Sequence, residues 1–185
     1  MKPRLFSNAR VVDPSRGLDE HGSVLVEDGR ISASGKAVLN QGAPEGAEII
    51  DCGGKAVLPG LVDARVIIGE PGAEHRETIA SASLAAAAGG VTSMVMMPDT
   101  DPAIDNVALV EFILRTARDT AVVNVFPAAA ITRGFEGKEM TEFGLLKEAG
   151  AVMLTEGRHT VASALIMRRA PVSYTHLTLP TILRV

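Results

Sequence analysis

The strongest indication of the fold is the sequence of residues 57–67, Val57-Leu58-Pro59-Gly60-Leu61-Val62-Asp63-Ala64-Arg65-Val66-Ile67. The Pro-Gly turn leads into an apolar run of the length expected for a buried strand. In a strand, residues i and i+2 point to the same face, so Arg65 and Ile67 share one face. Arginine keeps its proton in proteins and isoleucine has no lone pair, so neither side chain can be a metal ligand.

The composition predicts a cytoplasmic protein with neither a nucleic-acid nor a membrane partner. The chain has 185 residues, 46% of them hydrophobic, and it contains no Trp, so its core must consist of Ala, Val, Leu, Ile and Met. The net charge of -4 supplies no basic field for nucleic acid or acidic membranes. No apolar run approaches the length of a signal peptide or a membrane span. Cys52 is the only cysteine, which excludes an internal disulfide.

The first 57 residues have the pattern of a small β-sheet. Residues 40–46 have the composition of a loop, and Asp28-Gly29 is a tight-turn dipeptide. The predicted strands are residues 4–12, 23–27, 30–34 and 48–51. We therefore expect residues 1–57 to form one domain, an incomplete portion of a β-sandwich.

From Gly60 onward, strands alternate with helices. The predicted strands are residues 61–68, 91–97, 122–129 and 151–155. The predicted helices are residues 74–88, a segment capped by Asp105, and residues 141–149 and 160–170. Apolar strands that alternate with helices indicate a parallel sheet covered on both faces.

The number of these units favours part of a barrel. We count about four βα units, whereas a closed barrel has eight. An open doubly wound sheet is the alternative, but Gly69-Glu70-Pro71-Gly72 does not fit the glycine-rich phosphate loop of that fold. The predicted fold class is therefore α/β, with residues 58–170 as the first half of a (β/α)8 TIM barrel.

Residues 171–185 differ from the rest of the chain. Pro171 is expected to end the last helix, and Tyr174 is the only tyrosine. The segment resembles the conceptual translation of sequencing-adapter DNA. We therefore expect residues 171–185 to be non-native and the natural protein to continue past Ala170, with a genuine C-terminal tail as the alternative.

Several strings, in order, resemble the dihydroorotase family of the amidohydrolase superfamily, whose relatives include hydantoinases and allantoinases. They are Leu58–Asp63 (LPGLVD), Glu70–Ile79 (EPGAEHRETI), Ala85–Thr92 (AAAAGGVT) and Met97–Pro102 (MPDTDP). The resemblance extends from residue 5 to about 170. It implies a β-sandwich beside a (β/α)8 barrel, and it implies opening or closure of the dihydroorotate ring in pyrimidine biosynthesis. It also implies a zinc pair that polarises the amide carbonyl and supplies hydroxide.

The residues that the resemblance would make functional are absent from this sequence. The two metal-binding histidines of the family correspond to Arg65 and Ile67. The arginine that holds the substrate carboxylate corresponds to Gly69, and a substrate-binding asparagine corresponds to Asp99. The aspartate ligand after the fourth strand falls near residues 155–157, where Glu156 is the closest carboxylate. The later histidine ligands and the catalytic aspartate fall beyond Ala170.

These departures predict a non-catalytic family member. We expect no catalytic residue, no metal ligand except a remnant at Glu156, and no cofactor in this chain. The resemblance suggests aspartate transcarbamoylase as an assembly partner, or a homo-oligomer. The alternative is an active cyclic amidohydrolase whose zinc site is built from residues outside this sequence. A third hypothesis is that the 185-residue chain has no function of its own, because half a barrel leaves an open strand edge.

Other chemistry-bearing residues receive structural interpretations. Arg65 is expected to form an ion pair with Asp63, Asp99 or Glu156, since a buried cation needs a partner, although its planar fork also suits a phosphate or carboxylate. Asp63 is expected to make a structural hydrogen bond. His159 is a candidate for the barrel mouth. Structural or no roles are expected for His75 in the first turn of a helix, His21, His176, Cys52 and the core cluster of Met94, Met96 and Met97.

Overall fold

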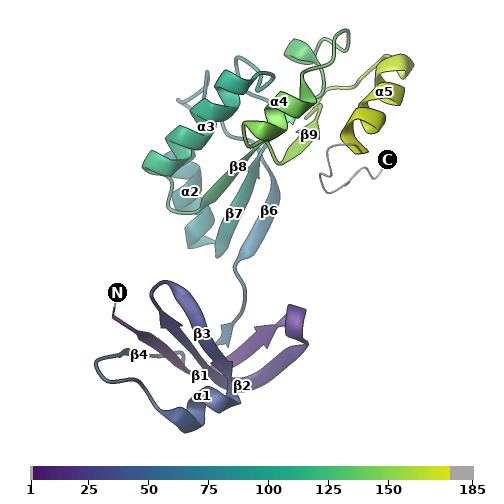
Figure 1. The fold of residues 1–185 in the computed structure, drawn as a ribbon. Helices are drawn as coiled ribbons and strands as arrows, with labels where there is room; N and C mark the ends of the chain where they lie inside the picture. The colour runs from purple at the N-terminus through teal and green to yellow at the C-terminus, as the bar shows by residue number, and fades with distance from the viewer. Residues whose placement is uncertain (1, 176–185) are drawn as a thin grey trace. The chain divides into compact units, whose positions relative to one another are not determined.

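A computed structural model describes the backbone of residues 2–175 and the side chains of residues 2–38 and 42–170. The chain forms two compact units that divide after Pro59 (Figure 1). None of the helices in the described part of the chain is both long and apolar enough to cross a membrane. The predictions for residues 176–185, His176 included, lie outside the described residues.

The first unit is a five-stranded sheet with one short helix. Its elements are β1 (Arg4–Asp13), the 3-10 turn η1 (Pro14–Arg16), β2 (Leu18–Glu27), β3 (Arg30–Gly35), α1 (Lys36–Gln41), β4 (Glu48–Asp51) and β5 (Ala56–Val57). The strand order is β3-β2-β1-β4, and β5 also pairs with β1. The β2–β3 hairpin turns at Asp28 and Gly29, both at positive φ, as the dipeptide predicts. Helix α1 was not predicted, and it extends into the expected loop at residues 40–46.

The second unit is a parallel sheet in the order β6-β7-β8-β9. Its elements are β6 (Leu61–Val66), α2 (Ile79–Ala88), β7 (Val91–Met96), α3 (Val107–Thr120), β8 (Asn124–Ala130), η2 (Arg133–Phe135), α4 (Phe143–Glu148), β9 (Met153–Thr155) and α5 (Ala164–Thr175). This parallel half-barrel sheet confirms the predicted fold class.

The core of the second unit lies between the sheet and helices α2, α3 and α4. Met94 and Met96 of β7 are fully buried there against Ile113 and other apolar side chains, so the methionine cluster is core packing as predicted. The expected cover on both faces is not found. Strand β7 alternates between buried and less buried residues, and Phe126 of β8 is exposed, so one face of the central strands is left uncovered. The edge strand β6 is exposed on both faces, since adjacent Leu61 and Val62 are both exposed.

Four predicted helix boundaries in three helices are wrong. Helix α2 begins at Ile79 rather than Glu74, because Thr78 and Ser81 form a capping box. The N-cap of α3 is Asn106 rather than Asp105, since the Asn106 side chain accepts the Leu109 N–H. Helix α5 begins at Ala164 and continues through Pro171 to Thr175. The expected stop at Pro171 is wrong, because an interior proline can kink a helix without ending it.

Candidate functional site at the carboxyl ends of the parallel strands

The carboxyl ends of β6 to β9 meet at one edge of the sheet, because the four strands are parallel. In barrels of this kind, ligands bind at that edge. The residues after the strands are therefore the candidates: Gly69 after β6, Asp99 after β7, Thr132 after β8 and Glu156 after β9.

The two positions singled out in the sequence lie at the end of β6, and both side chains are exposed. Arg65 lies in β6 and Ile67 directly follows it. The Asp63 carboxylate accepts the Arg65 backbone N–H at 3.0 Å, which is the structural hydrogen bond expected of it. Within the described residues no carboxylate forms an ion pair with the Arg65 guanidinium. The predicted ion pair is wrong because Arg65 is solvated here rather than buried, while Asp99 and Glu156 have other partners.

The loop that follows β6 closes over Gly69. The Ala73 N–H donates to the Gly69 carbonyl at 2.6 Å. A Cβ at residue 69 would lie 3.0 Å from the carbonyl carbon of Ala73 and closer still to its oxygen. Both obstacles are backbone atoms. No side chain, and certainly no arginine, fits at residue 69 unless this loop moves.

Two carboxylates hold the same loop in place. The Glu70 carboxylate accepts the Ile79 N–H at 2.8 Å, at the start of α2. The Glu74 carboxylate accepts the Gly72 N–H at 3.0 Å, and this hydrogen bond lowers the pKa of Glu74. His75 lies in this loop rather than in the first turn of α2, which corrects its predicted position.

Asp99 is buried and paired with Arg158. Its side chain is only 2% exposed. Asp99 Oδ1 accepts the Arg158 backbone N–H at 3.0 Å and the Arg158 Nε–H at 3.3 Å. Asp99 Oδ2 is buried and has no hydrogen-bond partner among the described residues. Gly157, at φ +61, packs directly on this carboxylate, and a Cβ there would lie 2.6 Å from Asp99 Cγ.

Glu156 is buried and both of its oxygens are bound by Thr132. Oε2 accepts the Thr132 backbone N–H at 3.0 Å, and Oε1 accepts the Thr132 hydroxyl. The same hydroxyl oxygen accepts the Gly137 N–H at 3.0 Å. Glu156 therefore anchors the loop of residues 131–141 to the end of β9. Sequence reasoning missed Thr132, although a threonine directly after an apolar strand is the available signal.

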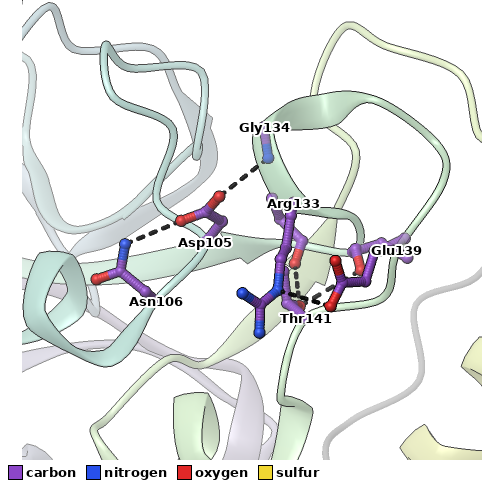
Figure 2. A network of polar contacts seen from close by, with 8 residues as sticks. Asp105, Asn106, Arg133, Gly134, Glu139 and Thr141 are labelled. Atoms are coloured by element: carbon purple, nitrogen blue, oxygen red, sulfur yellow. Dashed lines mark hydrogen bonds and ion pairs between the residues drawn. The ribbon is translucent and has the colours of Figure 1, made fainter.

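A second network fixes the far side of the same loop, as Figure 2 shows. Asp105 accepts the Gly134 N–H at 2.9 Å, which is its role in place of the predicted cap. The Arg133 N–H donates to the Glu139 carbonyl at 2.9 Å, and the Arg133 and Glu139 side chains form an ion pair at 3.4 Å. The loop of residues 131–141 is therefore held at both ends.

His159 lies at this edge but makes a ring contact rather than a ligand set. Its ring stacks on Phe135, with centroids 4.4 Å apart and planes 12° from parallel. Its backbone N–H donates to the Glu156 carbonyl at 2.9 Å. The other described histidines are remote from any metal-like cluster, and His21 contacts Asn8 in the first unit.

The zinc pair implied by the family resemblance does not fit the residues present. Arg65 and Ile67 have no donor for a metal, and the oxygens of Glu156 are bound by Thr132. In the part of the chain that the structure describes, no three His, Cys, Asp or Glu side chains are arranged to hold a metal ion. We therefore assign no metal chemistry to these residues.

Comparison with known proteins identifies the family. Residues 54–178 match the family model described as dihydro-orotase-like. A curated dihydroorotase from Pelobacter propionicus is 46% identical over 166 residues, which cover 90% of this chain and 38% of that protein. A dihydroorotase from Geobacter metallireducens is 45% identical with the same coverage. The chain thus spans less than two fifths of the length of these relatives.

Solved structures show the same fold. An L-hydantoinase (dihydropyrimidinase) from Arthrobacter aurescens superposes with a TM-score of 0.73 and 25% identity, covering 90% of this chain and 37% of that one. A crystal structure of a dihydroorotase superposes with a TM-score of 0.52 and 16% identity, which concerns the fold alone. By its sequence match and its half-barrel of parallel strands, this chain belongs to the dihydroorotase-like family.

Proposed function

We propose that this chain is part of a dihydroorotase-family protein of pyrimidine biosynthesis that does not itself hydrolyse the ring. The observation that carries the proposal is the closed backbone at Gly69. In the family, an arginine at this position holds the substrate carboxylate. Here the backbone carbonyl of Ala73 lies too close for any Cβ at residue 69, so the loop as it stands leaves no room for an arginine.

The other family positions support the same conclusion. The ring amide is a poor electrophile, and the family chemistry activates it with a metal pair and a metal-bound hydroxide. Arg65 and Ile67 supply no ligand for that metal pair, and Glu156 anchors the loop of residues 131–141. Asp99, where the family has asparagine, is already committed to Arg158. Each position has lost its family role in a different way.

The role that remains is assembly. We propose a cytoplasmic protein that supports aspartate transcarbamoylase or associates with itself, as degenerate members of this family are expected to do. Co-purification of a tagged chain with the aspartate transcarbamoylase of the same organism tests this role. Independent migration of the two proteins at micromolar concentration contradicts it.

An active dihydroorotase is the second candidate. It is favoured by the 46% identity to a protein curated as dihydroorotase. On this reading the zinc site is built from residues outside the present sequence. It predicts stoichiometric zinc and turnover in any longer product of the same reading frame.

One experiment separates the two candidates. The chain, and a longer gene product if the frame extends past Ala170, are incubated with dihydroorotate and zinc, and ring opening is followed by the loss of ultraviolet absorbance. The non-catalytic proposal expects no turnover above the rate of buffer containing zinc, and metal analysis is expected to find no stoichiometric zinc. Turnover that disappears on chelation would reject it.

A further inference from the structure

At the carboxyl edge of the sheet, a buried carboxylate holds the Nε of the Arg158 guanidinium, while most of the Arg158 side chain is exposed. The Arg158 side chain is 64% exposed, whereas the Asp99 side chain that binds it is 2% exposed. A single oxygen of Asp99, Oδ1, accepts hydrogen bonds from both the Nε–H and the backbone N–H of Arg158. The ion pair therefore fixes the base of the guanidinium and leaves its outer end toward solvent.

The segment that carries Arg158 is itself anchored on both sides. Glu156, two residues earlier, is buried and bound to Thr132. His159, the next residue, stacks on Phe135 and donates its N–H to the Glu156 carbonyl. Gly157 has no side chain, and only for that reason can the backbone lie against the Asp99 carboxylate. The position of Arg158 is thus fixed before any ligand arrives.

The two terminal nitrogens of Arg158 have no hydrogen-bond partner among the described residues. Within the described residues, Asp99 is the only group that forms a hydrogen bond or ion pair with this side chain, and it contacts Nε alone. The two Nη groups of a guanidinium form a planar fork that matches a carboxylate with paired hydrogen bonds. A fixed fork loses less conformational entropy on binding than a mobile one.

We propose that Arg158, positioned by Asp99, binds a small carboxylate anion at the carboxyl edge of the sheet. This site takes over, from a different strand end, the anion recognition that the family assigns to the position of Gly69. The inference rests on the proposed function in one respect: it describes ligand recognition that persists where hydrolysis has been lost. Arg158 is the binding residue and Asp99 is the positioning residue.

The shape of the fork favours a carboxylate, which accepts paired hydrogen bonds from the two Nη groups. Because Asp99 offsets the guanidinium charge, the site does not concentrate the positive charge that a phosphate dianion needs. Orotate serves as a stable carboxylate probe. Orotamide has the same ring with a neutral carboxamide, so the pair of probes isolates recognition of the charge.

The experiment is an NMR titration of the 185-residue chain with orotate and with orotamide. We expect orotate to shift amide signals at residues 157–159 and orotamide to bind at least tenfold more weakly. Arg158→Met is expected to abolish orotate binding, and Arg158→Lys to weaken it several-fold because the fork is lost. Arg118→Met is the matched control, since Arg118 is an exposed arginine in the last turn of α3.

Asp99→Ala tests the positioning role separately. It removes the acceptor that holds Arg158 Nε together with a nearby negative charge. Weaker orotate binding with an unchanged preference over orotamide is expected if positioning outweighs the charge, and tighter orotate binding contradicts the positioning role. Far-UV circular dichroism checks that each variant is folded. Equal binding of the two probes, or orotate binding that Arg158→Met leaves unchanged, overturns the inference. Turnover of dihydroorotate would instead reject the non-catalytic proposal and leave this binding result standing.

Discussion

Replacing Gly157 with alanine tests the packing of the backbone on the Asp99 carboxylate. Two effects of the substitution are expected to lower the free energy of unfolding, and they add. The residue has φ +61, and an L-residue in the left-handed region costs about 1–2 kcal/mol. The new Cβ would also lie 2.6 Å from Asp99 Cγ, so the carboxylate must move away from Arg158. Loss of a hydrogen bond between charged groups adds about 1.5–3 kcal/mol.

Gly157→Ala is therefore expected to destabilise the fold by about 3–5 kcal/mol, a large share of the stability of a typical domain. Gly134→Ala is the matched control. Gly134 has φ +56, but a Cβ there would lie 3.9 Å from Glu136 Cγ, which is ordinary van der Waals contact, so only the backbone cost of about 1–2 kcal/mol applies. The difference between the two variants isolates the contact with Asp99.

Urea unfolding followed by far-UV circular dichroism measures both variants, because most of the helices lie in the second unit. With a urea dependence of about 1–3 kcal/mol per molar, the two midpoints are expected to differ by about 1 M. In an Asp99→Ala background, Gly157→Ala is expected to cost no more than Gly134→Ala. Equal costs for Gly157→Ala and Gly134→Ala in the unmodified chain would mean that a Cβ at residue 157 does not displace the Asp99 carboxylate.

Three further predictions concern the same unit. Glu156→Gln places an amide donor against the donors of Thr132 and is expected to cost about 1–3 kcal/mol in urea unfolding, whereas Glu148→Gln, at an exposed position, changes little. Ile113→Ala opens a cavity in the core and is expected to cost about 2–5 kcal/mol, whereas exposed Leu145→Ala is expected to stay within about 0.5 kcal/mol. The Glu74 pKa, measured by NMR titration of its carboxyl carbon, is expected below the ordinary value of 4.5. Since the pKa of Glu74 is lowered in the folded state, its stabilisation of the fold is present above the ordinary pKa and is lost as the pH falls through the folded pKa. Glu74→Gln is expected to remove this pH dependence of stability.

Each of these predictions has a result that contradicts it. A Glu156→Gln variant as stable as Glu148→Gln would mean that Thr132 is not held by the Glu156 charge. An Ile113→Ala cost below 1 kcal/mol would mean that the core relaxes around the missing atoms. A Glu74 pKa at or above 4.5 would mean that the Gly72 N–H is not bound by its carboxylate in solution.

The fold was predictable because its signals are local and repeated. Continuous apolar strands such as 91–97, separated by helices that end in glycine, leave few alternatives to a parallel sheet. The boundaries were less predictable, because neighbouring residues compete for the same cap. Asp105 and Asn106 are both good N-cap residues. The Asp105 carboxylate instead accepts the Gly134 N–H, 29 positions later in the sequence, which leaves Asn106 as the cap. That contact exists only after the loop of residues 131–141 has folded.

Single side chains of the candidate site could be judged from the sequence, but their partners could not. Arg65, Ile67 and Gly69 offer no metal ligand by residue chemistry alone, and the family roles assigned to these positions stay predictions. The pairing of Asp99 with Arg158 spans 59 positions and depends on Gly157, which permits the approach. From the sequence, Arg65 was expected to pair with Asp63, Asp99 or Glu156, whereas an arginine in a loop, such as Arg158, carries no local signal.

The closed backbone at Gly69 also bears on how a metal and substrate site could be engineered into this chain. Histidine at residues 65 and 67 meets no obstacle among the described residues, because both side chains are exposed. Arginine at residue 69 is different, since it collides with the backbone of Ala73 and requires the loop to be rebuilt at the same time. Single substitutions therefore suffice at residues 65 and 67, whereas at residue 69 a design must open the loop first.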